Sequence, residues 1–355
     1  MSRVVVIGCG DMGERLAAGL AASGAVRELV LAGRPQDEIT AKATTIASSY
    51  DCRVRAVEVD DARDQAAVER LLGDASPDLV LQTAALQSPW ALVGRTDAAA
   101  RAVVAAGLGL RLPFQLPVLL SVMRAVRDVG LGCPVANISL PDATHAILAR
   151  LGLAPTVGLG NAAMQLMRVR AALRARRPDG ELPLVRVVGH HAQVYGVMQA
   201  QPPADPADRP WVYLGEEGLR DDALAYAAPA LAPGVRYNQV TAAAALPVLR
   251  ALLPGAAPLR WSTPAPLGLP GGYPVRIADG GVDLDLPADV GRDEAVAFHE
   301  RIGRADGIDR VDDDGTVHFT DEAREAVAAV APDLAEPLAI ADIDRRAARL
   351  LDLLG

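Results

Sequence analysis

The sequence contains no run of 18 apolar residues, which is about the length that a membrane-spanning helix needs. Its longest apolar stretch, residues 98–123, is interrupted by Arg101 and Arg111 and contains two prolines. Basic residues are also too few to give a surplus, since 35 Lys and Arg against 44 Asp and Glu leave a formal net charge of −9. We therefore expect neither a membrane nor a nucleic acid as the main partner, because binding nucleic acid requires a basic surplus to neutralise phosphates.

Cysteine is scarce as well. Cys9, Cys52 and Cys133 are scattered, and none forms a Cys-x-x-Cys pair, which argues against a disulfide framework and a structural zinc site. The chain enters a valine-rich segment at Val4 without the charged region and cleavage site of a signal peptide, so we expect a cytoplasmic protein. Its 355 residues, of which 51% are hydrophobic, are sufficient for two domains with sizeable cores.

Apolar β-branched runs alternate with helical patterns through the first 150 residues. This alternation predicts an α/β fold, a Rossmann-type doubly wound parallel sheet with helices on both faces. We assign residues 1–150 to a dinucleotide-binding domain. The expected strands are 3–7, 28–32, 53–59, 78–83 and 134–139, and the expected helices are 11–23, 38–49, 65–72, 97–106 and 116–129.

The second part, residues 151–355, mixes long helical patterns with short strands and proline-rich loops. Two short strands are expected around an Asp-Gly-Gly turn in residues 275–286, and a hairpin near 308–319. This pattern predicts an α+β substrate domain. A strand is also expected at 184–190, and helices at 162–176, 240–253, 292–304 and 336–354.

A Gly-x-Gly-x-x-Gly motif, Gly8-Cys9-Gly10-Asp11-Met12-Gly13, follows the first strand directly and opens the first helix. Gly8 permits a tight turn, Gly10 lets the backbone approach a pyrophosphate, and Gly13 lets the helix pack closely on the strand. The diphosphate would lie at the positive end of the helix, beside Asp11 and Met12. A tight turn without a ligand is the alternative interpretation.

The end of the second strand favours NADP over NAD. NAD-binding proteins carry an acidic residue there for the ribose 2′-hydroxyl, whereas this chain has Gly33-Arg34. Glycine leaves room for a 2′-phosphate and arginine can pair with it, although Arg34 could equally be a solvated loop residue and NAD stays possible. Thr83 and Ala84, where the fourth strand ends, are also expected to contact the cofactor.

Three segments resemble the lactate/malate dehydrogenase superfamily, which also includes the NAD-dependent family 4 glycosidases. Asn137-Ile138-Ser139-Leu140-Pro141 resembles a strand-ending Asn-Pro segment. Thr156-Val157-Gly158-Leu159-Gly160-Asn161 and the Arg-x-Arg that follows resemble the family's Val-Ile-Gly-x-Gly-Thr stretch and helix. Val187-Val188-Gly189-His190-His191 resembles the Gly-x-His that supplies the catalytic histidine.

The resemblance implies an active site in which some of the family's residues are present and others are replaced. His191 takes the proton-donor position and Arg168 the carboxylate-binding position. The aspartate that orients the histidine is replaced by Gln165, which could accept a hydrogen bond from His191 but carries no charge. The asparagine before the proline is replaced by Leu140, with Asn137 a few residues upstream. These departures argue against ordinary lactate or malate turnover and favour another small carbonyl, 2-hydroxy acid or imino acid.

Two further functions stay open. A glycosidase of family 4 holds a metal with a cysteine and a histidine, but residues 158–161 contain no cysteine, so we predict no metal. A regulatory dinucleotide-binding protein with a decayed site would explain Leu140 and Gln165. The resemblance also implies an oligomer, and we expect a homodimer in which the apolar helix 116–129 supplies the buried face.

Overall fold

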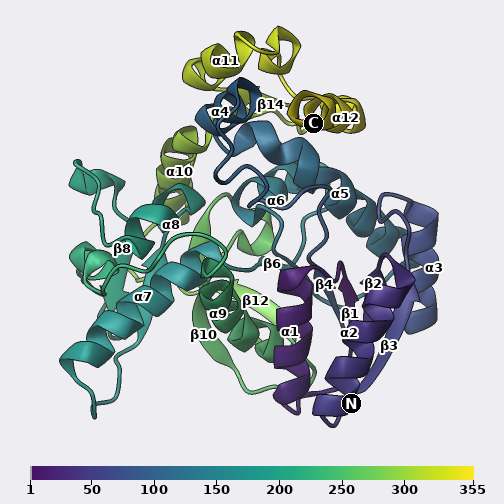
Figure 1. The fold of residues 1–355 in the computed structure, drawn as a ribbon. Coiled ribbons are helices and arrows are strands. Elements are labelled where there is room, and N and C mark those ends of the chain that lie inside the picture. The colour runs from purple at the N-terminus through teal and green to yellow at the C-terminus, as the bar shows by residue number, and fades with distance from the viewer. Residues whose placement is uncertain (1) are drawn as a thin grey trace.

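The computed structural model describes residues 2–355. A six-stranded parallel sheet in the order β3-β2-β1-β4-β5-β6 forms the first lobe. The order reverses between β1 and β4, and ligands of such sheets bind at the carboxyl ends of the strands beside this point. The predicted α/β class is confirmed (Figure 1). The strands are β1 Ser2–Ile7, β2 Val26–Gly33, β3 Arg53–Glu58, β4 Leu79–Gln82, β5 Val135–Asn137 and β6 Val157–Gly158.

Helices cover both faces of this sheet. One face packs on α1 and α2 through buried leucines and isoleucines such as Leu16, Leu20 and Ile39. The opposite face packs on α3 to α6, with Val5 and Ile7 of β1 pointing toward them. The alternation of Val4 and Val6 with Val5 and Ile7 therefore fills two cores, as a doubly covered strand requires. The helices are α1 Asp11–Ala22, α2 Gln36–Ser49, α3 Gln65–Ala75, α4 Ala98–Ala105, α5 Leu112–Val129 and α6 Pro141–Arg150.

The second lobe combines two small antiparallel sheets with three long helices and the short helix α8. The two sheets meet where Gly189 and Gly272 exchange backbone hydrogen bonds of 3.1 and 3.0 Å. Glycine is needed at position 272 for this approach, because a Cβ there would lie 2.7 Å from the Gly189 carbonyl oxygen, and at position 189 a Cβ would lie 1.8 Å from Gln165 Oε1. The elements are α7 Asn161–Arg176, β7 Val185–Val188, α8 His191–Met198, β8 Trp211–Leu214, β9 Leu219–Arg220, α9 Tyr237–Ala251, β10 Leu259–Pro264, β11 Gly272–Ala278, β12 Gly281–Leu284 and α10 Arg292–Gly303.

The C-terminal segment returns to the first lobe. Helix α12 (Ile343–Leu354) packs on α5, and α11 (Asp321–Ala328) packs on α4, so residues 317–354 share a hydrophobic core with the parallel sheet (Figure 1). The short hairpin β13 Ile308–Val311 and β14 Val317–Phe319 leads into this segment. The division at residue 150 stays a prediction, but β6 extends the first sheet to residue 158 and the last 40 residues or so are packed on the first lobe.

Three local expectations need correction. The strand expected at 184–190 ends at Val188, because His190 caps helix α8 instead of continuing the strand. The helix expected at 336–354 begins only at Ile343. Fourteen of the 18 residues of α5 are buried inside this chain, so the helix cannot supply the dimer face for which it was proposed, and the homodimer stays a prediction without that support.

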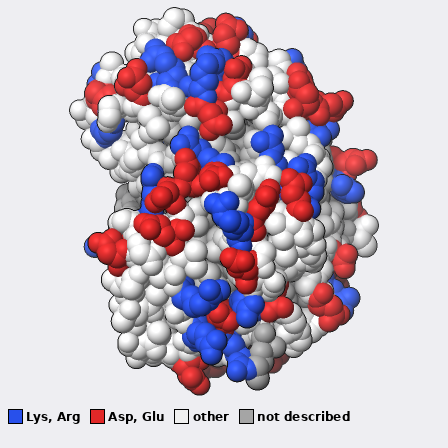
Figure 2. Space-filling model, turned by 90° about the vertical axis from the view of Figure 1, so that its right-hand side faces the viewer, with Lys and Arg blue, Asp and Glu red and all other residues white. Residues whose placement is uncertain are grey.

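On the face shown in Figure 2, Lys and Arg side chains are interspersed with Asp and Glu. Within residues 2–355, no single helix is both long enough and apolar enough to cross a membrane. The segments Ala98–Ala105 and Gly109–Val129 would reach that length and apolar character only together, and they meet at a bend of 116°.

Candidate active site

The glycine-rich loop has the geometry of a dinucleotide cradle. Gly8 has φ = +97°, and a Cβ there would lie 2.5 Å from the Ala84 nitrogen. A Cβ on Gly13 would lie 2.0 Å from the Gly8 carbonyl oxygen, so helix α1 can approach the loop only with glycine at this position. In contrast, a Cβ on Gly10 would have no atom within 4 Å, which leaves open space where a pyrophosphate would approach.

Helix α1 begins at Asp11, and its N-cap Gly10 offers no side chain to the first amides. These N–H groups therefore remain available to an anion. Thr83 supports the loop from β4, since its hydroxyl donates to the Gly8 carbonyl at 2.5 Å. The residues present thus fit a dinucleotide, although Thr83 and Ala84 act on the loop itself and Met12 packs partly into the core.

Asp11 connects the loop to the second lobe. Its carboxylate accepts hydrogen bonds from Arg15 at 2.9 Å and from the Asn238 amide at 2.7 Å, and the bond with Arg15 lowers the pKa of Asp11. Asn238, the second residue of α9, also accepts a hydrogen bond of 3.1 Å from the Trp90 indole. Because Trp90 lies in the loop after β4, this chain of contacts ties that loop and the start of α1 to α9 of the second lobe.

Arg34 follows β2 at the predicted cofactor-choice position. Its side chain is exposed and makes no ion pair or hydrogen bond to any residue between 2 and 355, whereas the nearby Asp61 is paired with Arg63 at 2.6 Å. A Cβ on Gly33 would make only ordinary contacts, the nearest with the Cys9 nitrogen at 3.6 Å. The guanidinium of Arg34 is therefore free to pair with a phosphate.

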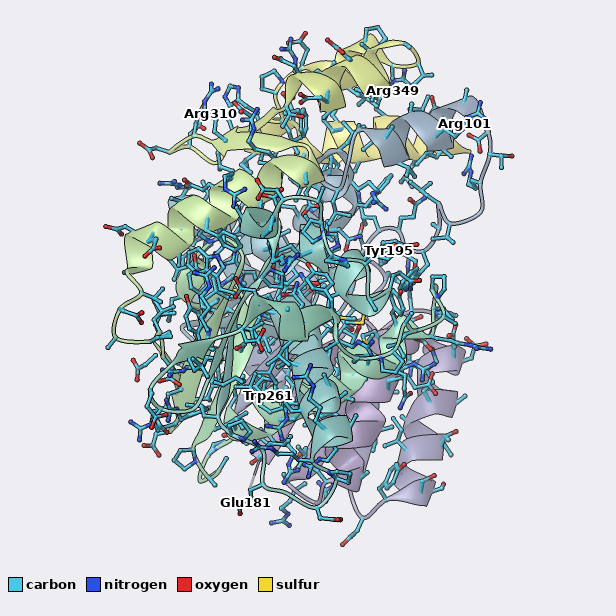
Figure 3. All side chains as sticks on the ribbon, turned by 90° about the vertical axis from the view of Figure 1, so that its left-hand side faces the viewer. Arg101, Glu181, Tyr195, Trp261, Arg310 and Arg349 are labelled. Carbon is cyan, nitrogen blue, oxygen red and sulfur yellow. The ribbon has the colours of Figure 1, made fainter. Side chains whose placement is uncertain are left out.

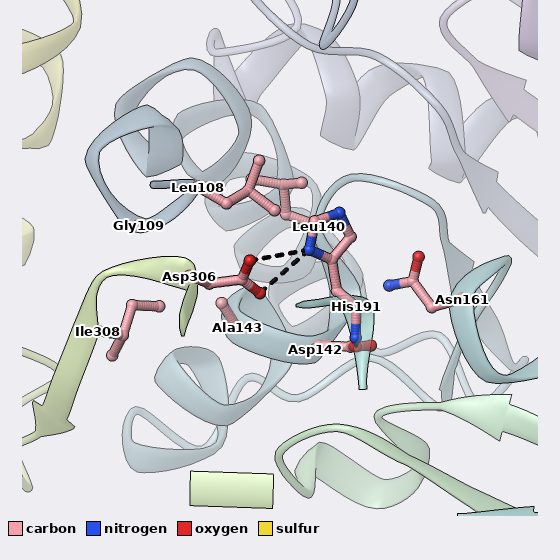
Figure 4. Close-up of a pocket in the computed structure, with 9 residues that line it drawn as sticks. All are labelled: Leu108, Gly109, Leu140, Asp142, Ala143, Asn161, His191, Asp306 and Ile308. Atoms are coloured by element: carbon pink, nitrogen blue, oxygen red, sulfur yellow. Dashed lines mark hydrogen bonds and ion pairs between the residues drawn. The ribbon is translucent and has the colours of Figure 1, made fainter. Parts of the chain in front are cut away.

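His191 and Asp306 form the central pair of the second site (Figure 4). The imidazole Nδ1 lies 3.0 Å from both carboxylate oxygens of Asp306, to which it donates its hydrogen. Asp306 is buried, while the His191 side chain is 34% exposed, and Nε2 has no hydrogen-bond partner in the described chain. The pair thus leaves one imidazole nitrogen available to a reacting group.

A second carboxylate holds the backbone of His191. Asp142, the second residue of α6, accepts the His191 N–H at 2.6 Å, and its other oxygen is buried without a partner among the described residues. His190 caps α8, since its Nδ1 accepts the Ala192 N–H at 3.2 Å and the Gln193 side chain accepts the His190 N–H. His190 is therefore structural.

The charges around the imidazole favour its protonated form. Burial lowers the pKa of His191, but the Asp306 carboxylate, with help from Asp142, more than offsets burial, so that the pKa is raised above its usual value. Burial alone would raise the pKa of Asp306, yet the His191 ring holds it below its usual value. Asp142 differs, because burial raises its pKa despite the neighbouring histidines. A raised imidazole pKa suits a proton donor near neutral pH.

Gln165 does not orient His191, which corrects the sequence-based assignment. Its amide nitrogen donates to the backbone oxygen of His190 at 2.9 Å, and its oxygen lies against Gly189. The orienting carboxylate is present after all, but it comes from Asp306, 115 residues away. The sequence carried no local signal for it, because Asp306 lies in the turn between α10 and β13 and matches no motif of the resembled family.

Arg168 and Asn137 are also separated from the His191 ring. Arg168 is buried and donates to the backbone oxygen of Pro229, so its guanidinium is engaged inside the second lobe. Asn137 is fully buried, and its oxygen accepts the Ser139 N–H at 2.9 Å while its nitrogen contacts His145 Nε2 at 3.1 Å. Neither side chain lines the cavity beside His191. Asn137 builds the turn after β5 instead of contacting a substrate.

His145 is a structural histidine. Its Nδ1 contacts the Ala265 carbonyl oxygen at 2.9 Å, and its Nε2 faces the amide nitrogen of Asn137. Burial lowers the pKa of His145 to about 4, although the hydrogen bond to the Ala265 carbonyl opposes this shift. The ring is therefore neutral and takes no part in proton transfer at neutral pH.

A small cavity of about 10 Å³ lies beside the His191–Asp306 pair, room for about one water molecule. A substrate therefore enters only if part of the lining moves. Tyr195, four residues after His191 on the same face of α8, is 59% exposed, so this face leads to solvent (Figure 3). The cavity is lined by Leu108, Gly109, Leu140, Asp142, Ala143, Asn161, His191, Asp306 and Ile308.

Side chains that could bind a metal ion do not form a cluster among the described residues. Across residues 2–355, no group of three or more His, Cys, Asp or Glu side chains is placed to hold a metal ion. The site consists instead of a histidine whose ring is held by Asp306 and whose backbone is held by Asp142.

Comparison with known families supports the cofactor assignment. Residues 4–110, less than a third of the chain, match the profile of the family described as Saccharopine dehydrogenase NADP binding domain. This segment includes the glycine-rich loop, Arg34 and Thr83. The match supports a nicotinamide dinucleotide as cofactor, with NADP favoured. Among curated proteins, no sequence matches significantly.

Solved structures share the fold at low sequence identity. One is a lactate dehydrogenase from a Medee basin deep-sea metagenome library, with 13% identity and a TM-score of 0.50. Another is the malate dehydrogenase from Picrophilus torridus, with 14% identity and a TM-score of 0.53. Each alignment covers 86% of this chain and 96% of the other. At such identities the likeness concerns the fold alone.

Proposed function

We propose that this protein is an NADP-dependent oxidoreductase that acts on a small carbonyl, 2-hydroxy acid or imino acid substrate. The observation that carries the proposal is the His191–Asp306 pair, in which Nδ1 of the ring lies 3.0 Å from the carboxylate oxygen. The pair lies at the carboxyl edge of the parallel sheet, and the turn after the first strand of that sheet forms the dinucleotide cradle. The profile match over residues 4–110 supports the cofactor. The dehydrogenase fold of the neighbouring structures agrees with this chemistry but does not name a substrate.

Two separate groups of residues would bind the cofactor and transfer the proton. The free amides after Gly10 would hold the cofactor diphosphate, and Arg34 would pair with its 2′-phosphate. When bound, the nicotinamide supplies or accepts the hydride. When the substrate is reduced, His191 would deliver the matching proton from Nε2 to the substrate oxygen or nitrogen, and in the reverse direction it would take that proton. Asp306 fixes the ring and stabilises its charged form.

The two alternatives from the sequence have less support. The regulatory interpretation depended on the loss of the orienting aspartate at Gln165, and Asp306 provides an equivalent carboxylate at hydrogen-bond distance. The glycosidase interpretation requires a metal held by a cysteine and a histidine. His191 is paired with a carboxylate, and the three cysteines lie elsewhere, in the first lobe.

Cofactor titration tests the proposal. NADPH is expected to bind more tightly than NADH, and Arg34→Ala should weaken NADPH about 10–100-fold while changing NADH little, because one charge-assisted phosphate contact is lost. Arg27→Ala is the matched control, since Arg27 is an exposed arginine at the opposite end of the same strand. Equal affinity of the wild type for both cofactors would contradict the choice of NADP, and failure to bind either would contradict the proposed function.

A further inference from the structure

Lys42 is the only lysine in the sequence, since every other member of its 35 Lys and Arg residues is an arginine. It lies on α2 beside the glycine-rich loop, and its side chain is 17% exposed. The ammonium group donates to the Cys9 carbonyl oxygen at 2.5 Å. Because Cys9 stands between the first two glycines of the motif, Lys42 contacts the backbone of the cofactor cradle directly.

The same ammonium group contacts two carboxylates from the helices beside the loop. Its Nζ lies 2.7 Å from Glu38 of α2 and 3.7 Å from Glu14 of α1. Three oxygens from three segments suit the three hydrogens of an ammonium, whereas a guanidinium directs its donors within one plane. Burial lowers the pKa of Lys42, but the two glutamates more than offset burial, so that the pKa is raised and the group is charged.

Strand β2 holds Cys9 from its other side. The Cys9 thiol lies 3.6 Å from the Ala32 carbonyl oxygen, which also accepts the Gly8 N–H at 2.8 Å. Contacts with β2 and α2 together therefore fix the orientation of the peptide between Cys9 and Gly10.

This orientation decides which end of the peptide an incoming anion meets. In a planar trans peptide the carbonyl and the following N–H point in opposite directions. Because the Cys9 carbonyl points to Lys42, the Gly10 N–H points away from it, and this N–H donates to no atom of residues 2–355. Glycine adopts both signs of φ, so without Lys42 the peptide could turn over and present its oxygen to the anion.

We propose that Lys42 is a positioning residue of the cofactor site, which holds the Cys9–Gly10 peptide so that its N–H faces the diphosphate of the dinucleotide. The inference rests on the proposed function, because it requires a dinucleotide in the cradle. It also separates two tasks. Lys42 serves the diphosphate that NADP and NAD share, whereas Arg34 serves the 2′-phosphate that only NADP carries.

The test compares three ligands that contain the same diphosphate, namely NADPH, NADH and ADP-ribose. Calorimetric titration of the full-length protein is expected to show that Lys42→Met weakens all three by one common factor, about 10-fold, because the diphosphate loses a backbone donor. Lys42→Arg should recover part of the affinity for all three, since a guanidinium can still donate to the Cys9 carbonyl. If Lys42→Met does not fold, Lys42→Arg is compared instead, and its smaller loss must again be equal for the three ligands.

Arg55→Met is the matched control. Arg55 is likewise paired with a glutamate, Glu28 at 3.0 Å, and its replacement removes the same single positive charge, but Arg55 makes no hydrogen bond to the glycine-rich loop. Equal weakening of the three ligands in Lys42→Met, with unchanged affinities in Arg55→Met, supports the proposal. Loss of NADPH affinity alone, unchanged affinity for all three ligands, or equal weakening in both variants overturns it. A wild type that binds none of the three would instead contradict the proposed function.

Discussion

The cofactor cradle, residues 8–13, and the histidine cleft, formed by Asp142, His191 and Asp306, lie at the same edge of one sheet. The two sites are assembled in opposite ways. The cradle and Arg34 are close in sequence, with support from Thr83 and Ala84 at the end of β4. The cleft brings together Asp142, His191 and Asp306 from three separate elements. A local motif can be recognised from spacing alone, whereas a site of distant residues depends on how the lobes pack.

His191→Ala should have the largest effect in this comparison. Turnover is expected to fall about 10²–10⁴-fold because the proton donor is lost, while NADPH affinity stays nearly unchanged since the ring does not belong to the cradle. Steady-state kinetics on a substrate of the wild type, together with NADPH titration, measure both quantities. Unchanged turnover would show that the histidine cleft is not the reaction site.

Asp306→Asn tests whether the distant carboxylate controls the imidazole. The amide carries no charge, so the pKa of His191 should fall and the limb of the pH–rate profile governed by the ring should move to lower pH. Turnover at pH 7 is expected to fall about 10–10²-fold. Gln165→Glu is the control, because Gln165 contacts the His190 backbone. A larger shift of the profile in Gln165→Glu than in Asp306→Asn would restore the assignment from the sequence.

These two regions show how far the sequence could predict the molecule. The β-α alternation predicted the five strands up to residue 139, and the glycine motif identified the cradle, because both depend on local patterns. His191 was proposed through a short motif. Asp306 was missed, since its carboxylate reaches His191 only when the turn after α10 packs on α8. Arg168, which was placed by family spacing, instead donates to the Pro229 carbonyl inside the second lobe.

The pH dependence of stability tests whether His145 is a structural histidine, in contrast to His191. Its folded pKa of about 4 lies below the unfolded value near 6.5, so the unfolded chain binds a proton that the folded chain rejects. The stability that this difference contributes is present above pH 6.5 and is lost as the pH falls toward 4, by about 2 kcal/mol at pH 5. Urea unfolding at pH 7 and pH 5 should show this loss in the wild type and a smaller loss in His145→Gln. An equal loss in both proteins would contradict the assignment.

Gly10→Ala tests the cradle with the smallest change. A Cβ at Gly10 would meet no atom within 4 Å and the residue has φ = −68°, which alanine adopts easily, so the fold should be unaffected. The methyl group would occupy the space that the pyrophosphate approaches, and NADPH affinity is expected to fall roughly tenfold or more.

Gly73→Ala in α3 is the matched control, because its Cβ also meets no atom within 4 Å but lies far from the glycine-rich loop in sequence and on the opposite face of the sheet. Fluorescence titration with NADPH and thermal unfolding of both variants provide the measurement. If Gly10→Ala bound NADPH as tightly as Gly73→Ala, the open space at Gly10 would not be the diphosphate site, and the turn would be structural only.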